Sequence, residues 1–258
     1  MRGLAAAVLL AATSAAEPTY VPVEGGALRS VLPPAPQQQE TRVAPFRLRR
    51  TAVTNRDFLA FVIRHPEWRR GTVAALFADG GYLRHWAGPL TLGAEADAEQ
   101  PVTQVSWFAA RAYCAEEERA RLPTWSEWEY VAAASESARD ARQDPAWRQR
   151  ILDWYAVPGD RPLARVGGQP ANFYGIQDLH GAIWEWVEDF NSLLVSADNR
   201  EQGDPDRTRF CGSGALSMEQ KENYAVLMRI ALLSSLQAAY TTRNLGFRCA
   251  RGDAEPGR

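Results

Sequence analysis

Two carboxylate residues, Asp178 and Glu185, stand at a spacing that could bind a cation. Gly181 lies between them, and a glycine permits the tight backbone turn that a shared ion would need. Calcium takes six to eight oxygen ligands, from carboxylates and from backbone carbonyls that such a turn can direct inward. The segment therefore predicts a Ca²⁺ site. In the alternative interpretation, Glu185 pairs with an arginine or a helix end. His180 is a poor calcium ligand, and we expect it to lie exposed on this loop.

The cysteines and histidines give a weaker signal. The cysteines are too far apart for a C-x-x-C metal or redox pair, and in an oxidising compartment an odd number leaves at least one thiol unpaired. Which of them pair stays open. The histidines are too scattered to form a metal motif, and isolated histidines are usually surface or capping residues, although folding could still bring them together. The residues are Cys114, Cys211 and Cys249, with His65, His85 and His180.

Capping signals predict three helices that would position these groups. Thr54 and Asn55 precede a helix over 56–63, whose inner face carries phenylalanines and a valine (Phe58, Phe61 and Val62). Ser106 caps a helix over 107–119. Thr124 and Glu127 form a capping box for a helix over 125–134. In the second helix, the residues at helical spacing predict the buried face: Phe108, Ala112, Tyr113 and Glu116.

Short strands are predicted between these helices. Residues 20–23 suggest an edge strand, followed by a proline-rich loop. Residues 46–50 alternate apolar and basic side chains, which is typical of a half-buried strand. Residues 102–105 suggest another short strand, and 135–149 are polar, exposed and partly helical.

The composition is that of a soluble globular protein of 258 residues, with 46% hydrophobic and 23% charged residues. The formal net charge of −2 gives no reason to expect a nucleic acid or an acidic membrane as partner. Nine tryptophans are unusual. Large rigid side chains suit a fold with little regular secondary structure, in which a few big residues fill the space between loops.

The N-terminus has the pattern of a secretory signal. Residues 1–16 combine an arginine, an apolar run and small residues for cleavage, and the run is too short for a membrane anchor. We therefore expect a periplasmic or secreted protein. The expected organisation is a signal peptide at 1–16, a strand and proline-rich loop at 17–40, a main domain at 41–251 and a disordered tail at 252–258.

Four blocks of sequence resemble the formylglycine-generating-enzyme, or sulfatase-modifying-factor, family, in family order over about residues 46–250. An early V-T-N (53–55) precedes a long block that combines P-V-T-Q-V-S-W, A-Y-C and R-L-P-T-W-S-E-W-E-Y (101–130). N-F-Y-G-I-Q-D-L-H-G-A-I-W-E-W (172–186) and N-L-G-F-R-C (244–249) follow. The resemblance implies an α+β fold related to C-type lectins. It also implies that calcium would be held by the side chains of Asp178 and Glu185 and the carbonyls of Gly181 and Ile183.

The two cysteines that bind copper and oxidise substrate in enzymes of this family are absent. Counting back from the last block places Ala225 at the second cysteine and Gln220 at the first, whereas counting forward places Leu216 at the first. Cys211 is the remaining soft ligand. A lone thiolate cannot make a bis-thiolate copper site, although it could join a methionine (Met218, Met228) or a histidine; Met228 is expected instead to pack in the core.

The sequence therefore predicts a divergent, exported member that acts as an accessory or maturation factor for another exported protein or peptide. Its groove would include Arg229, Arg243 and Asn244, beside an apolar run at 226–233; alternatively, 224–239 is a buried helix that replaces the family's loop. Two other hypotheses remain open. One is a metal-dependent oxidase, with copper as the candidate metal, that acts on a protein or small thiol and uses Cys211 as a catalytic residue. The other is a calcium-dependent lectin-like binding module. The oligomeric state is not predicted.

Overall fold

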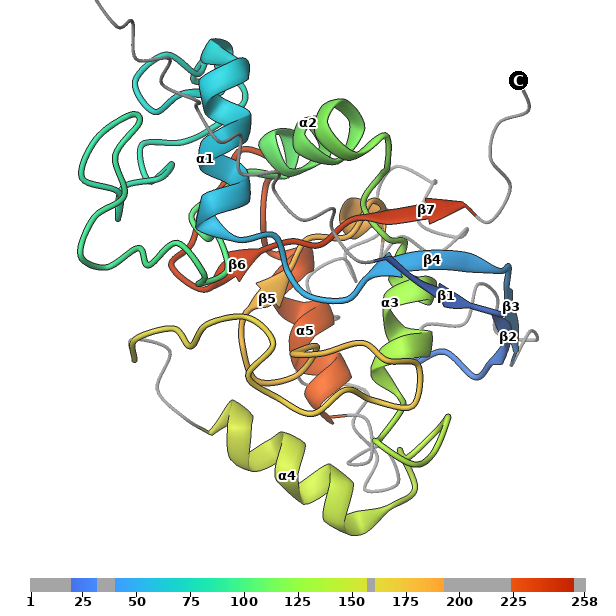
Figure 1. The fold of residues 1–258 in the computed structure, drawn as a ribbon. Coiled ribbons are helices and arrows are strands. Elements are labelled where there is room, and N and C mark those ends of the chain that lie inside the picture. The colour runs from blue at the N-terminus through green and yellow to red at the C-terminus, as the bar shows by residue number, and fades with distance from the viewer. Residues whose placement is uncertain (1–19, 32–39, 157–160, 193–223, 253–258) are drawn as a thin grey trace, which may run out of the picture.

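A three-stranded antiparallel sheet brings the two ends of the domain together (Figure 1). The computed structural model describes residues 20–31, 40–156, 161–192 and 224–252. Strand β4 (Phe46–Arg49) lies between β1 (Tyr20–Val23) and β7 (Ala250–Gly252). The predicted edge strand and half-buried strand are therefore confirmed. Because β1 pairs with β4 along its whole length, residues 20–23 are part of the domain's sheet.

Two smaller pairs contain the remaining strands of the described residues. β2 (Gly26–Leu28) pairs with β3 (Thr41–Val43), and β5 (Trp184–Glu185) runs parallel to β6 (Leu245–Gly246). The strand expected over 102–105 is wrong. Gln104 adopts a left-handed backbone with φ of 54°, which interrupts an extended run. The segment instead makes isolated backbone hydrogen bonds to neighbouring loops.

The three capped helices form where the sequence predicts them. Helix α1 (Asn55–Arg64) begins at the N-cap Thr54, whose hydroxyl accepts a hydrogen bond from the backbone amide of Asp57. Helix α2 (Trp107–Glu118) begins at Ser106, and α3 (Trp125–Ala132) has the full capping box predicted from the sequence. A side-chain oxygen at each N-cap satisfies an amide that the helix itself leaves unpaired.

The buried face of α2 differs from the expected one. Ala109, Ala110 and Cys114 are fully buried, whereas Phe108 and Ala112 are only partly buried and Glu116 is exposed. Two adjacent alanines let α2 pack closely on the core. The larger side chain of Phe108 lies to one side of this face and contacts Phe77 at the surface. Tyr113 is buried as expected.

The described residues also contain two further helices and two short 3₁₀ turns. Helix α4 (Pro145–Tyr155) extends beyond the partly helical segment expected at 135–149, and its Trp147 and Ile151 form a small cluster of their own. Helix α5 (Tyr224–Ser234) packs against α4 and the turn η2 (Phe190–Ser192). The turn η1 (Pro66–Trp68) follows α1 directly. In Figure 1, α4 lies at the end of the molecule opposite α1 and α2.

One large aromatic core joins these elements. Phe58, Tyr113 and Phe247 contact one another with ring centroids 5.4–6.0 Å apart. A disulfide between Cys114 of α2 and Cys249, just before β7, crosses this core. This settles the pairing that the sequence leaves open. Within the described ranges, no helix combines the length and apolar character needed to cross a membrane.

Candidate functional site

The loop that carries the predicted calcium ligands is held by protein donors. Asp178 has a left-handed φ of 60° and is buried. Its carboxylate accepts the backbone amides of Gly167 and Gln169. The Gly181 carbonyl accepts a hydrogen bond from Arg161 at 3.2 Å. Donors from residues 161–169 therefore hold the loop at 178–181 in place.

Glu185, at the other end of the loop, is fully buried in an ion pair. Both of its carboxylate oxygens contact Arg248, at 2.8–3.0 Å, and the indole N–H of Trp128 donates to the same carboxylate at 3.0 Å. Neither charged side chain has any solvent exposure. The alternative interpretation of Glu185, pairing with an arginine, describes this arrangement.

These donor sets do not fit a calcium ion. A cation within ligand distance of Glu185 would lie beside the Arg248 guanidinium, which already neutralises the carboxylate. The side chain of Ile183 is buried. The structure therefore uses the polar groups of Asp178, Gly181 and Glu185 to hold the fold.

Arg229, expected in a substrate or partner groove, is instead in the interior. It is only 1% exposed, lies 3.6 Å above the ring of Trp128, and donates to the Glu185 carbonyl. Burial lowers the pKa of Arg229 to about 10, which still leaves the guanidinium charged at neutral pH. The side chain enters from α5 and faces inward, so it is not available to a partner.

The other residues of the expected groove, Arg243 and Asn244, do not face the same site as Arg229. Arg243 is exposed and lies 3.6 Å from Glu95, and the Asn244 carbonyl accepts the amide of Trp184 beside β5. The apolar run belongs to α5: Ile230 and Leu233 are buried, whereas Met228 is 43% exposed. The segment is therefore a helix, as in the alternative interpretation, but the helix ends at Ser234 rather than 239 and is buried on one face only. The expectation that Met228 packs in the core is wrong.

His180 is not exposed, contrary to expectation. Its imidazole lies between the rings of Trp128 and Trp147, with centroids 5.8 and 5.7 Å away. Its Nε2 lies 2.8 Å from the carbonyl of Ala132. Because burial disfavours the charged ring, the pKa of His180 falls to about 4. The sequence could not reveal this, since the two tryptophans come from distant helices.

A cavity of about 400 Å³ opens beside His180. Trp147, Ile151 and Arg150 of α4 line one side, and the segment from Gln169 to His180 lines the other. This volume is in the range of sites that hold a small ligand or one large side chain. The wall is mixed in character, with indole rings, an arginine and amide groups, which suits an amphipathic guest more than a purely apolar one.

Of the predicted redox residues, Cys211, Leu216, Met218 and Gln220 lie outside the described residues. The backbone of Ala225 lies in the first turn of α5. Cys114 and Cys249 are joined to each other. The copper interpretation of Cys211 therefore stays a prediction.

Comparison with known proteins agrees with this architecture. A family profile described as "Sulfatase-modifying factor enzyme 1-like domain" matches residues 6–253. A formylglycine-generating enzyme of Streptomyces coelicolor is 31% identical over 255 residues, covering 81% of this chain and 79% of its own. A protein named inactive C-alpha-formylglycine-generating enzyme 2, from Bos taurus, is 27% identical over 84% of this chain and 81% of its own.

A more distant structural match supports the fold. The crystal structure of CarF superposes with a TM-score of 0.51 at 19% identity, covering 92% of this chain and 98% of that one. The mixed α+β fold with little regular secondary structure agrees with this likeness. The chain thus belongs to the sulfatase-modifying factor enzyme 1-like family.

Proposed function

We propose that this domain binds a segment of another exported protein and assists its maturation without making formylglycine. The observation that carries the proposal is the use of the cysteines. The chain has three, and the Cys114–Cys249 disulfide takes two of them into the core. Only Cys211 remains as a thiol, whereas a bis-thiolate copper site needs two.

The relatives support the half of the proposal that concerns catalysis. The Streptomyces coelicolor relative is named a formylglycine-generating enzyme, whereas the Bos taurus relative is named an inactive one, at comparable coverage of this chain. The family scaffold is thus found in proteins with and without that named activity. Because a fold does not by itself carry a function, the binding half rests on the site that this chain presents.

The cavity beside His180 is the proposed contact for one side chain of the bound segment. Arg150 lies at its rim, with its side chain 59% exposed and 3.0 Å from Glu136. This pair offers both a positive and a negative group to an incoming polar side chain. Trp147 and Ile151 give the apolar part of the wall.

The catalytic half is tested with a C-x-P-x-R peptide, Cu(I) and O₂. The wild-type protein is expected to give no thiol loss and no O₂ uptake above a protein-free control. Turnover that disappears in Cys211→Ala would overturn the proposal in favour of an oxidase.

The binding half is tested by selecting peptides from a displayed library on the purified domain and measuring their affinity by fluorescence anisotropy. Arg150→Glu at the cavity rim is expected to weaken binding at least about tenfold. The matched control is Arg56→Glu, because Arg56 is similarly exposed and paired, with Glu99, away from the cavity. Equal effects of the two reversals would contradict the assignment of the cavity.

Export is the remaining part of the proposal and rests on residues 1–16. When the full chain is expressed in a bacterium, mass spectrometry of the periplasmic fraction is expected to find a mature protein beginning at Glu17. An intact Met1 start, with the protein retained inside the cell, would contradict export.

A further inference from the structure

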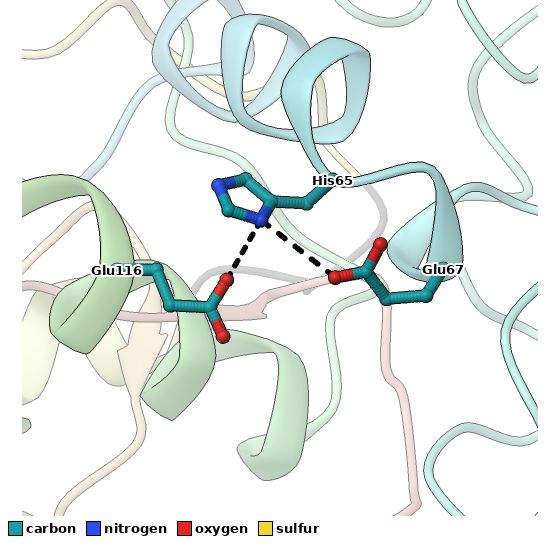
Figure 2. A group of neighbouring side chains, drawn as sticks. All are labelled: His65, Glu67 and Glu116. Carbon is teal, nitrogen blue, oxygen red and sulfur yellow. Dashed lines mark ion pairs between the residues drawn. The ribbon is translucent and has the colours of Figure 1, made fainter.

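We propose a binding site for a divalent transition-metal ion of the zinc class, made by His65, Glu67 and Glu116. Figure 2 shows the three side chains converging from the end of α1, the turn η1 and the last turn of α2. The Nδ1 atom of His65 lies 2.8 Å from a Glu116 oxygen and 3.6 Å from a Glu67 oxygen. One ligand atom from each residue falls within 4.8 Å of the others.

These distances suit one small ion among the three groups. Zinc binds histidine nitrogen and carboxylate oxygen at about 2.0–2.2 Å, so two ligands at the tetrahedral angle stand about 3.4 Å apart. The two distances from Nδ1 lie on either side of that value, and small rotations of the glutamates would equalise them. The three groups leave a fourth position for water, which is common in zinc sites open to solvent.

The opposite side of the imidazole supplies an independent argument. His65 Nε2 lies 3.1 Å from Glu117, and Glu117 is itself held by Arg64 through a hydrogen bond of 2.9 Å from the guanidinium Nε. A histidine that binds a metal through one nitrogen almost always donates its other N–H to a carboxylate, a backbone carbonyl or a water, which fixes the tautomer and orients the ring. With Nε2–H donated to Glu117, the lone pair of Nδ1 points toward Glu67 and Glu116.

That tautomer leaves a charge to be balanced. A neutral imidazole has one N–H, so an Nδ1 lone pair would face two negative carboxylates unless a proton or a metal ion stood between them. Two of the three glutamates at the end of α2 already face arginines: Glu117 pairs with Arg64, and the buried Glu118 lies 3.5 Å from Arg49. Glu116 lies at the negative end of the helix dipole, where a further carboxylate charge is unfavourable. A divalent cation would neutralise Glu116 and Glu67 and join α1 to α2.

The site is accessible yet partly ordered. The side chains of His65, Glu67 and Glu116 are 26%, 62% and 42% exposed, so an ion can reach them from solvent. The ring of Phe61 packs against the imidazole, with centroids 4.8 Å apart, and restricts its rotation. Imidazole together with carboxylates suits zinc and its neighbours in the transition series better than calcium, which prefers oxygen alone.

Isothermal titration of the untagged, metal-free protein with Zn²⁺ tests the proposal. All measurements use a Cys211→Ser background, so that the free thiol cannot contribute. One equivalent of Zn²⁺ is expected to bind and to raise the melting temperature, because the ion binds only the folded arrangement. His65→Ala should abolish this binding, and Glu116→Gln should weaken it strongly.

Two further variants separate metal binding from general charge effects. Glu117→Gln, which keeps the residue's size but removes the carboxylate behind the ring, is expected to lower affinity about tenfold. Glu136→Gln is the control, since Glu136 is likewise paired with an arginine, Arg150, but lies away from His65, and it should leave affinity for Zn²⁺ unchanged. Nitrogen-15 spectra should show Nδ1 shifting on zinc addition while Nε2 stays protonated. Failure of the wild type to bind, or unchanged affinity in His65→Ala, overturns the proposal.

Discussion

Glu185 and Arg248 form an ion pair that links four segments of the chain in the interior. The guanidinium holds both carboxylate oxygens and also donates to the carbonyls of Arg49, Arg50 and Gln177. The pair therefore connects the end of β4, the loop before β5, β5 itself and the approach to β7. Glu185, a predicted calcium ligand, thus stabilises the fold. The sequence predicts this role only as an alternative interpretation.

Replacing Glu185 with glutamine should strongly destabilise the fold. The substitution keeps the shape but leaves Arg248 as a buried charge without a counter-ion, which typically costs about 3–5 kcal/mol. Urea unfolding followed by tryptophan fluorescence measures this loss. Glu136→Gln breaks an exposed pair with Arg150 and should change the unfolding free energy by no more than about 1 kcal/mol. Similar losses in both variants would contradict the assigned role of the buried pair.

The helix starts and the strands β1 and β4 were predictable because their causes are local. A hydroxyl three residues before an acidic side chain caps α1 and α3 within a single turn, so Thr54 and Thr124 can be read without the rest of the fold. The strand expected at 102–105 failed because a left-handed residue, Gln104, is dictated by contacts with distant loops. The buried face of α2 also depends on what packs against it.

The site was less predictable because its contacts are long-range. Asp178 and Glu185 were identified as important, but their partners Gly167 and Arg248 are separated from them by 11 and 63 positions. His180 looked like a surface residue because nothing local indicates that Trp128 and Trp147 enclose it. His65 and Glu116 were each visible in the sequence, but only the packing of α1 on α2 brings them together.

Removing the Cys114–Cys249 disulfide should lower stability without changing the fold. It joins positions 135 residues apart, and loss of a native cross-link of this kind typically costs about 2–5 kcal/mol. The double variant Cys114→Ser, Cys249→Ser should therefore unfold at lower urea concentration, whereas Cys211→Ser should match the wild type. Titration with a thiol reagent in denaturant should find one reactive cysteine in the oxidised protein. Three reactive thiols before reduction would show that the disulfide is absent.

Substituting Gly181 tests how tightly the loop is packed. Its φ of 109° is strained for any other residue, and an added Cβ would overlap the side-chain Nε2 of Gln169 and lie 3.1 Å from the indole nitrogen of Trp154. Gly181→Ala should cost more than about 2 kcal/mol, measured by thermal unfolding. Gly71 also has a positive φ, of 86°, but an added Cβ there meets nothing within 4 Å, so Gly71→Ala isolates the backbone strain of about 1 kcal/mol. An equal loss in both variants would mean that Gln169 moves aside freely.

The buried imidazole of His180 should make stability depend on pH in a defined window. Its pKa falls to about 4 in the folded protein, below the value of about 6.5 in an unfolded chain. Between these values the unfolded chain binds a proton that the folded protein excludes, so stability is complete above about pH 6.5 and falls as the pH drops toward 4. The loss of unfolding free energy reaches at most about 3 kcal/mol.

Urea unfolding between pH 7 and pH 5 measures the part of this loss that occurs before most carboxylates begin to titrate. His180→Gln can still donate to the Ala132 carbonyl but does not titrate, so its stability should change much less over the same range. A slope that persists unchanged in this variant would assign the pH dependence to another group.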